Sequence, residues 1–205
     1  MSETLEFVHR YEPGEDPETL LLLHGTGGDE TDLLPLGRHL APRAGRLAPR
    51  GRVLENGMPR FFRRLAPGIF DEADLRRQVA DLVRFLGAAA KRYGFDPARV
   101  WAVGYSNGAN MAAALLLLYP EALRGAVLLR PVLPLRPKAE PDLRGRAVLI
   151  LAGERDPWAP REQVEALAWV LEAAGASVTL RWHPDGHAMA SEEIAIARDW
   201  LQRWL

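Results

Sequence analysis

The feature that most constrains the fold of this chain is the motif G-Y-S-N-G at residues 104–108, a G-x-S-x-G sequence placed between two different patterns. The largely apolar residues 99–103 before it are typical of a buried strand, and the Ala/Leu-rich residues 109–118 after it are typical of a helix. A sharp strand-to-helix turn projects the hydroxyl of Ser106 away from its own backbone, where a base can reach it. We therefore predict a strand, a tight turn and a helix, with Ser106 as a nucleophile.

The few serines and the absence of cysteine also favour Ser106 as the nucleophile. The chain has no cysteine, which excludes disulfides, thiolate metal sites and a cysteine nucleophile. The other serines are Ser2 at the terminus, Ser177 beside a predicted strand start and Ser191 in the last predicted helix. The alternative interpretation of the motif is an ordinary glycine-flanked turn, and the flanking strand and helix patterns argue against it.

Length and charge fit one ordinary globular domain. The 205 residues are 48% apolar and 26% charged, which predicts a single domain over residues 1–205 with a well-filled core. The net charge of −1 and the pI of about 6.5 give no sign of nucleic-acid or membrane binding. The acidic first residues do not resemble a signal peptide, and the longest apolar run, residues 111–119, is too short to cross a bilayer. We therefore expect a cytoplasmic protein.

Apolar runs of strand length alternate with helical patterns along the chain. This alternation predicts an α/β fold in which a mainly parallel sheet of about seven strands is covered by helices on both faces. The predicted strands are residues 5–10, 20–24, 46–49, 100–105, 125–130, 147–152 and 178–182, and the predicted helices are residues 31–42, 71–93, 107–119, 161–174 and 191–205.

Two connections bear on function. The proline-rich segment between the predicted strands 125–130 and 147–152 is too short for an inserted cap domain. Residues 51–70 form a long segment without clear periodicity, and long loops of this kind are often functional. We therefore predict a fold without a cap domain, in which residues 51–70 contribute to the site.

A serine nucleophile requires a base, and after a strand–turn–helix motif of this type the acid and then the histidine follow in the chain. His183 and His187 are the histidines that follow Ser106. His187 lies in a D-G-H turn after the last predicted strand, whereas His183 is nearer the strand and precedes a proline. We favour His187 as the base because its loop places the imidazole at the carboxyl edge of the sheet. A surface or structural histidine is the alternative for either residue.

The acid that orients the histidine is expected after the penultimate strand, in the sequence A-G-E-R-D-P at residues 152–157. Asp156 and Glu154 both qualify, and we favour Asp156 because it lies farther beyond the strand end, where it can reach His187 Nδ1. Asp185 is a weaker candidate because it is nearly adjacent to the base in sequence. The alternative role for Asp156 is a turn or helix cap, since a helix is predicted just after it.

An oxyanion hole requires two backbone N–H groups aimed at one point. We predict one from Asn107, which follows the nucleophile, and the other from Thr26 in the sequence H-G-T-G-G at residues 24–28. This glycine-rich sequence matches neither a dinucleotide-binding nor a P-loop pattern, which argues against a phosphate site. His24 is expected to support the site through hydrogen bonds.

Together, these motifs resemble the carboxylesterase/phospholipase family of compact α/β-hydrolases, which includes acyl-protein thioesterases. The resemblance covers nearly the whole chain and is nearest to a bacterial branch of small esterases carrying G-M-P-R-F-F-R-R, here residues 57–64. The chain departs from thioesterase relatives in their M-P-x-W-F-D segment and in having Asn107 where they usually have Gln. The resemblance implies an α/β-hydrolase fold, a triad of Ser106, Asp156 and His187, oxyanion amides of Thr26 and Asn107, and no metal or cofactor.

The expected substrates are short- to medium-chain carboxylic esters, hydrolysed through an acyl-enzyme. Without a cap the site is expected to be shallow, with an apolar wall and with Arg60, Arg63 and Arg64 able to attract an anionic substrate. The alternative is that the phenylalanines of this segment pack under the loop and the arginines are solvated. The substrate-binding residues that we expect are His24, Met58, Phe61, Phe62 and Trp158.

Other interpretations remain open from the sequence. A thioesterase or lysophospholipase would use the same triad, a lyase or peptidase would use the same scaffold, and a non-catalytic binding protein would need no triad. Dienelactone-hydrolase chemistry with a cysteine nucleophile is excluded by composition. The expected partner is a small-molecule ester, without nucleic acid or membrane, and exposed apolar helix faces leave a homodimer open.

Overall fold

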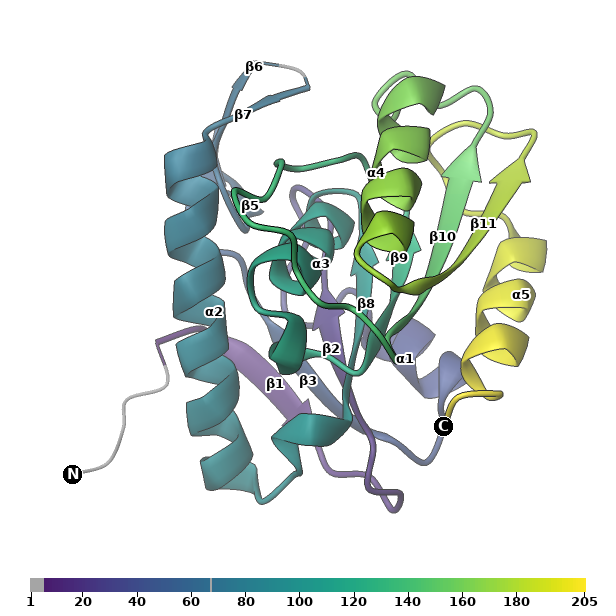
Figure 1. The fold of residues 1–205 in the computed structure, drawn as a ribbon. Coiled ribbons are helices and arrows are strands. Elements are labelled where there is room, and N and C mark those ends of the chain that lie inside the picture. The colour runs from purple at the N-terminus through teal and green to yellow at the C-terminus, as the bar shows by residue number, and fades with distance from the viewer. Residues whose placement is uncertain (1–5, 67) are drawn as a thin grey trace.

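The computed structural model describes residues 6–66 and 68–205 and contains a seven-stranded sheet with helices on both faces (Figure 1). The strand order is β1-β3-β2-β8-β9-β10-β11, in which β1 is antiparallel to β3 and the other pairings are parallel. The predicted mainly parallel α/β sheet is therefore confirmed. The strands are β1 (His9–Glu12), β2 (Thr19–Leu23), β3 (Gly45–Pro49), β8 (Val100–Tyr105), β9 (Gly125–Leu129), β10 (Ala147–Gly153) and β11 (Ser177–His183).

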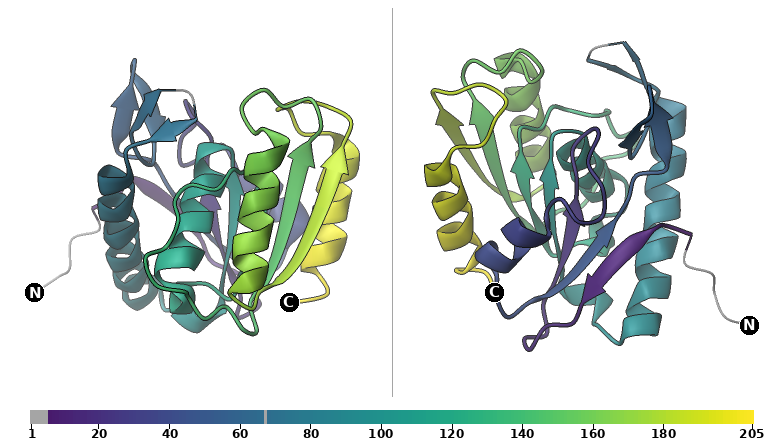
Figure 2. Two further views of the ribbon diagram at one scale, coloured as in Figure 1. Left: turned by 45° about the horizontal axis from the view of Figure 1, so that its top comes forward. Right: turned by 180° about the vertical axis from the view of Figure 1, so that it is seen from behind.

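Alternate side chains of each central strand point to opposite faces of the sheet, which gives the protein two cores. In β2, Leu21 and Leu23 belong to the core formed with α2, α3 and α4, while Leu20 and Leu22 belong to the core formed with α1 and α5. Figure 2 shows the two helical layers on either side of the twisted sheet. The helices are α1 (Leu34–Leu40), α2 (Glu72–Tyr93), α3 (Asn107–Leu118), α4 (Arg161–Ala173) and α5 (Ser191–Leu201), with single 3-10 turns η1 (Pro97–Arg99) and η2 (Pro120–Ala122).

The predicted elements differ from the observed ones mainly at their ends. The predicted helix 31–42 starts late, because Asp29 Oδ1 accepts from the backbone N–H of Thr31 at 2.7 Å and keeps this segment in a turn. The predicted last helix ends at Leu201, after which the chain turns through bonds to carbonyls three or four residues back. The first strand begins at His9, and Leu5, where it was predicted to begin, lies outside the described residues.

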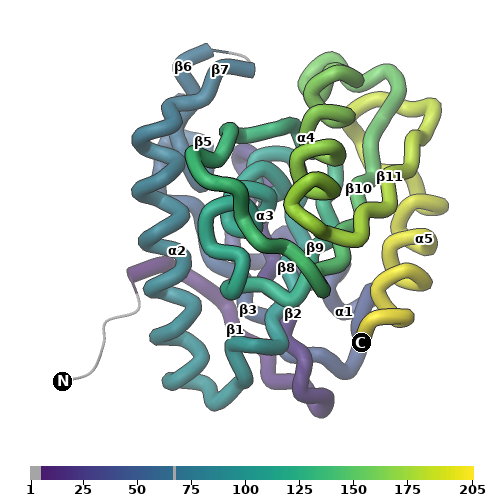
Figure 3. Tube along the Cα trace, viewed as in Figure 1, coloured from purple at the N-terminus to yellow at the C-terminus, as the bar shows by residue number. Residues whose placement is uncertain are grey.

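The segment 51–70 forms two short hairpins that the sequence analysis did not predict. They pair β4 (Val53–Glu55) with β5 (Met58–Arg60) and β6 (Arg64–Ala66) with β7 (Ile69–Phe70). The β4–β5 turn is Asn56-Gly57, whose φ angles of +51° and +79° match a known hairpin signal. Figure 3 shows the β6–β7 hairpin at the same end of the molecule as the carboxyl ends of β10 and β11.

The carboxyl edge of the sheet is not covered by an inserted domain. The connection of residues 130–146 between β9 and β10 is described throughout and contains no helix or strand. Across the two described ranges, no helix is both long enough and apolar enough to span a membrane.

Candidate active site

Ser106 lies at the turn between β8 and α3 with φ +53° and ψ −113°, a conformation that residues other than glycine rarely adopt. Its backbone N–H donates to Leu129 O at 2.8 Å, which fixes the turn against β9. A Cβ on Gly104 would lie 2.5 Å from Gly108 O, and a Cβ on Gly108 would lie 1.9 Å from Leu23 O. Both glycines are therefore required by backbone contacts, and the predicted strand–turn–helix is confirmed.

Ser106, His187 and Asp156 form a hydrogen-bonded chain that joins three loops. His187 Nε2 lies 2.9 Å from Ser106 Oγ, and His187 Nδ1 lies 2.7 Å from Asp156 Oδ2. The Asp156 side chain is fully buried, and its Oδ1 accepts from the backbone N–H of Trp158 at 2.9 Å. When Asp156 accepts a hydrogen bond from Nδ1–H of a neutral His187, Nε2 is available to accept the serine proton. The arrangement can therefore activate a serine hydroxyl.

The alternative candidates from the sequence lie outside this chain of hydrogen bonds. His183 Nδ1 accepts from the backbone N–H of Asp185 at 3.3 Å. Asp185 and Glu154 are exposed and pair with surface arginines. The geometry therefore brings the favoured histidine and the favoured aspartate to Ser106, and not their alternatives.

The loop that carries Thr26 is hydrogen-bonded to the β4–β5 hairpin. The N–H of Gly27 donates to Pro59 O at 2.9 Å, and Arg60 Nη1 donates to Thr26 Oγ1 at 2.6 Å. Thr26 lines the cavity beside Ser106. The hairpin therefore determines where the backbone amide of Thr26 lies.

Asn107 is hydrogen-bonded to Phe61, the residue that follows the same hairpin. It is the first residue of α3, where backbone N–H groups have no acceptor within the helix. Its Oδ1 accepts from the backbone N–H of Phe61 at 2.8 Å. Asn107 also lines the cavity, as Thr26 does, so the two residues expected to supply the oxyanion amides lie at one site.

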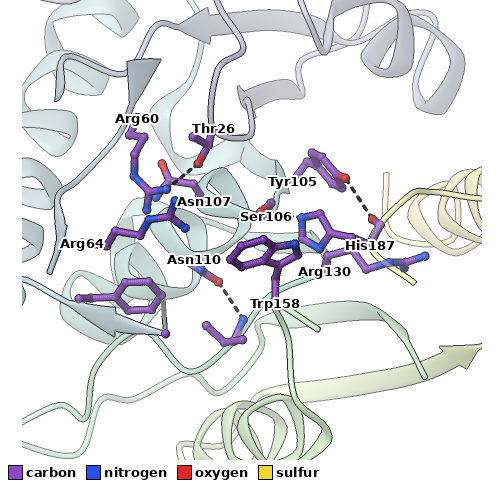
Figure 4. Close-up of a pocket in the computed structure, with 13 residues that line it drawn as sticks. Thr26, Arg60, Arg64, Tyr105, Ser106, Asn107, Asn110, Arg130, Trp158 and His187 are labelled. Atoms are coloured by element: carbon purple, nitrogen blue, oxygen red, sulfur yellow. Dashed lines mark hydrogen bonds between the residues drawn. The ribbon is translucent and has the colours of Figure 1, made fainter. Parts of the chain in front are cut away.

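A cavity of about 310 Å³ opens beside Ser106 (Figure 4). In this view His187 lies on one side of Ser106, and Arg60, Arg64 and Asn107 lie on the other. Polar side chains make up much of the wall, and Phe70, Val132 and Trp158 supply its apolar part.

Of the expected substrate-binding residues, Trp158 lines the cavity, and it is 53% exposed. Phe61 and Phe62 are 1% and 0% exposed and pack in the core with α2 and α3, so the expectation that they line the site is corrected. Burying these two aromatic rings removes a large apolar surface from water, which stabilises the fold and explains why they do not face the cavity. Met58 is 40% exposed and lies outside the cavity lining.

His24 is buried and does not line the cavity. Its Nδ1 donates to Gly25 O at 2.6 Å, and its Nε2 accepts from the backbone N–H of Gly51 at 2.9 Å. Burial lowers the pKa of His24, partly opposed by the bond to Gly25. A neutral His24 therefore joins the Thr26 loop to the start of the 51–70 segment.

Arg130 is a site residue that the sequence analysis missed. It follows β9 with φ +57°, its side chain is fully buried, and it donates to both carboxylate oxygens of Glu193 at 2.6 and 2.7 Å. It also donates to Gly186 O at 2.9 Å and to Ala188 O at 2.7 Å. These two carbonyls flank His187, so Arg130 fixes the loop that carries the imidazole. A charged residue at the end of a fully apolar strand was the signal for it.

The chain is similar to known proteins over nearly its whole length. Residues 63–199 match the model of the dienelactone hydrolase family. The chain is 49% identical to MhqD of Bacillus subtilis (strain 168) over 194 residues, which cover 95% of this chain and 97% of that protein. The Bacillus cereus carboxylesterase structure matches with a TM-score of 0.95 and 48% identity over 98% of this chain and 95% of that one. The Mesorhizobium loti carboxylesterase structure matches with a TM-score of 0.87 and 40% identity over 92% and 90%.

These similarities confirm the resemblance to compact α/β-hydrolase esterases that the motifs indicated. In this chain Ser106 occupies the strand-to-helix turn, and the sequence contains no cysteine. The chain belongs to the dienelactone hydrolase family and is a carboxylesterase-like hydrolase with the α/β-hydrolase fold.

Proposed function

We propose that the protein hydrolyses short- to medium-chain carboxylic esters through a Ser106–His187–Asp156 triad and an acyl-enzyme intermediate. The observation that carries this proposal is the pair of contacts at His187, 2.9 Å to Ser106 Oγ and 2.7 Å to Asp156 Oδ2. A base within hydrogen-bond reach of the nucleophile, itself oriented by a buried carboxylate, is the arrangement that acyl transfer requires.

The proposed reaction has two stages, formation of the acyl-enzyme and its hydrolysis. Ser106 Oγ attacks the ester carbonyl carbon while His187 takes the serine proton and Asp156 stabilises the imidazolium. The carbonyl oxygen becomes an oxyanion that the amides of Thr26 and Asn107 stabilise. Collapse breaks the bond to the alcohol, which leaves with the proton from His187. Water then attacks the acyl-enzyme, His187 takes its proton, and collapse releases the carboxylic acid and returns a proton to Ser106.

The dimensions of the cavity favour a small acyl group. Its volume of about 310 Å³ is at the lower end for small-molecule sites. Phe70, Val132 and Trp158 give it an apolar part for a short chain, while its arginines and asparagines make it unsuited to a long acyl tail. This polarity favours simple esters over lysophospholipids.

Labelling with a fluorophosphonate probe, mapped by mass spectrometry, tests the nucleophile. We expect the label on Ser106 and its absence from Ser106→Ala, with a loss of several orders of magnitude in kcat. The control is Ser177→Ala, because Ser177 lies in β11 and outside the cavity lining. A folded Ser106→Ala protein with full esterase activity would refute the assignment.

A series of p-nitrophenyl esters of increasing chain length tests the substrate class, with an acyl-thioester and a lysophospholipid as comparisons. We expect the highest kcat/KM for short chains. Preference for the thioester or the lysophospholipid would replace the ester assignment while keeping the triad. A folded protein with neither label nor turnover would favour a non-catalytic binding protein.

A further inference from the structure

The cavity beside Ser106 carries unbalanced positive charge. Among the described residues that line it, Arg60, Arg64 and Arg130 are charged and none is acidic. Arg130 is neutralised by its two hydrogen bonds to the Glu193 carboxylate. Arg60 and Arg64 are therefore the cations whose charge is available to a ligand.

Arg60 and Arg64 share one carboxylate, that of Glu55. Glu55 Oε2 lies 3.2 Å from Arg60 Nε, and Glu55 Oε1 accepts from Arg64 Nε and Nη2 at 2.9 and 2.6 Å. Arg60 is only 3% exposed, and its burial lowers the pKa of the guanidinium, as does the charge of Arg64. One carboxylate balances one of the two cations, so the group retains a net charge of about +1 in a poorly hydrated place.

Asn107 adds a hydrogen-bond donor that makes no bond to any described residue. The residue is 2% exposed and lines the cavity, and its Oδ1 is already bonded to the N–H of Phe61. Its Nδ2 is also buried and makes no hydrogen bond within the part of the chain that the structure describes. An unpaired buried donor is unfavourable, and a ligand oxygen would satisfy it.

We propose that the substrate carries a carboxylate on its acyl part, bound by Arg60, Arg64 and the side-chain amide of Asn107. The inference rests on the proposed ester hydrolysis and specifies its substrate class. A guanidinium pair with a carboxylate is a strong, charge-assisted interaction, and the described residues that line the cavity include donors and no acid.

The position of His187 places the carboxylate on the acyl part and not on the alcohol. His187 has to protonate the leaving alcohol, so the alcohol part of the ester faces His187. Arg60, Arg64 and Asn107 lie on the opposite side of Ser106 (Figure 4). The acyl part therefore extends toward the arginines, and a half-ester of a short dicarboxylic acid is the class of substrate that fits.

The test compares monoethyl glutarate with ethyl pentanoate, which differ by a carboxylate in place of the terminal methyl group. Acid release is followed in a pH-stat at low ionic strength. We expect kcat/KM to be at least about tenfold higher for monoethyl glutarate, the range of a hydrogen-bonded charge pair. Arg64→Gln is expected to bring this ratio close to one. Arg64 is the better position to vary because Arg60 also supports the Thr26 loop.

Arg63→Gln is the matched control. Arg63 has the same charge and adjoins Arg64 in sequence, but it is exposed, pairs with Asp71 and does not line the cavity. It is expected to keep the wild-type ratio. An equal loss of the ratio in Arg63→Gln would overturn the proposal, because general surface charge would then explain the preference.

A wild-type ratio of one or less, with clear turnover of ethyl pentanoate, would overturn the carboxylate site and leave the esterase function intact. If neither ester is hydrolysed, the carboxylate site is tested separately by the change in melting temperature that glutarate causes. Protection of the wild type by glutarate that is lost in Arg64→Gln would support the site while the esterase function fails. Absence of protection in the wild type would overturn the site as well.

Discussion

The buried ion pair between Arg130 and Glu193 is an interaction whose loss we expect to be costly. The side chains are 0% and 2% exposed and share hydrogen bonds of 2.6 and 2.7 Å. Glu193→Gln preserves the size of the side chain but leaves the charge of Arg130 buried without a counter-ion. Removing one partner of a buried pair costs about 3–5 kcal/mol, a large part of the about 5–15 kcal/mol that stabilises a domain.

This loss is measurable by urea unfolding, and in a thermal melt it corresponds to about 6–20 °C for a domain of this size. Burial tends to raise the pKa of Glu193, but hydrogen bonds from Arg130 and Ala190 outweigh it, and the pKa is lowered from 4.5. The pair therefore contributes stability above about pH 4.5 and loses it as the pH falls through the lower folded value. The variant and the wild type should differ most near pH 7 and converge in acid.

The double variant Arg130→Met with Glu193→Leu separates stability from positioning of His187. Replacing both charges with apolar groups is expected to recover at least about 2 kcal/mol relative to Glu193→Gln. It leaves the carbonyls of Gly186 and Ala188 without their donor, so we expect kcat to be about 10- to 100-fold lower than in the wild type while KM changes little.

Steady-state kinetics well below the melting temperature, with the active sites titrated by fluorophosphonate, supply the comparison. A double variant with recovered stability and a wild-type kcat would show that Arg130 serves only the fold. A Glu193→Gln protein within about 1 kcal/mol of the wild type would refute the energetic reasoning itself.

Three further predictions concern the glycine turn, the cavity wall and the buried histidine. Gly108→Ala should cost about 3 kcal/mol or more in unfolding free energy, because its Cβ would lie 1.9 Å from Leu23 O; an unchanged urea midpoint would contradict this. Trp158→Ala should change stability by less than about 1 kcal/mol because the side chain is half exposed, and should shift ester preference toward longer chains; an unchanged chain-length profile would remove Trp158 from the wall. Because the pKa of His24 is lowered from 6.5, its contribution to stability is complete above about pH 6.5 and falls with decreasing pH, by up to about 1.4 kcal/mol per unit; urea midpoints that stay constant between pH 6.5 and 5 would count against it.

The main elements of the site could be predicted because they depend on the order of strands and loops. Ser106, Asp156 and His187 follow β8, β10 and β11, and the carboxyl ends of parallel strands meet at one edge of the sheet. Local patterns identified these strands, so the motifs after them could be placed together before any distance was known. The glycines at 104 and 108 were predictable for the same reason, since their requirement is local.

Residues whose role depends on long-range packing could not be placed in this way. Arg130 and Glu193 are 63 positions apart, and no local pattern pairs them. The sequence was equally compatible with Phe61 and Phe62 in a cavity wall or in the core. Their burial depends on how the hairpin packs on α2 and α3. The Asn56-Gly57 turn was a local signal of that hairpin, but its strands are only three residues long and give no usable periodicity.

The two short hairpins therefore affect more than the shape of the cavity mouth. The β4–β5 hairpin and the residue after it hold the Thr26 loop through Pro59 and Arg60, and hold Asn107 through the N–H of Phe61. Both expected oxyanion amides thus depend on one segment, which also carries the cations proposed to bind the substrate. Amides contribute to rate only when they are fixed in advance, since reorganisation during the reaction would cancel their effect. Changes in this segment should therefore alter kcat together with substrate preference, so we expect the segment that lacked a pattern in the sequence to couple binding to catalysis.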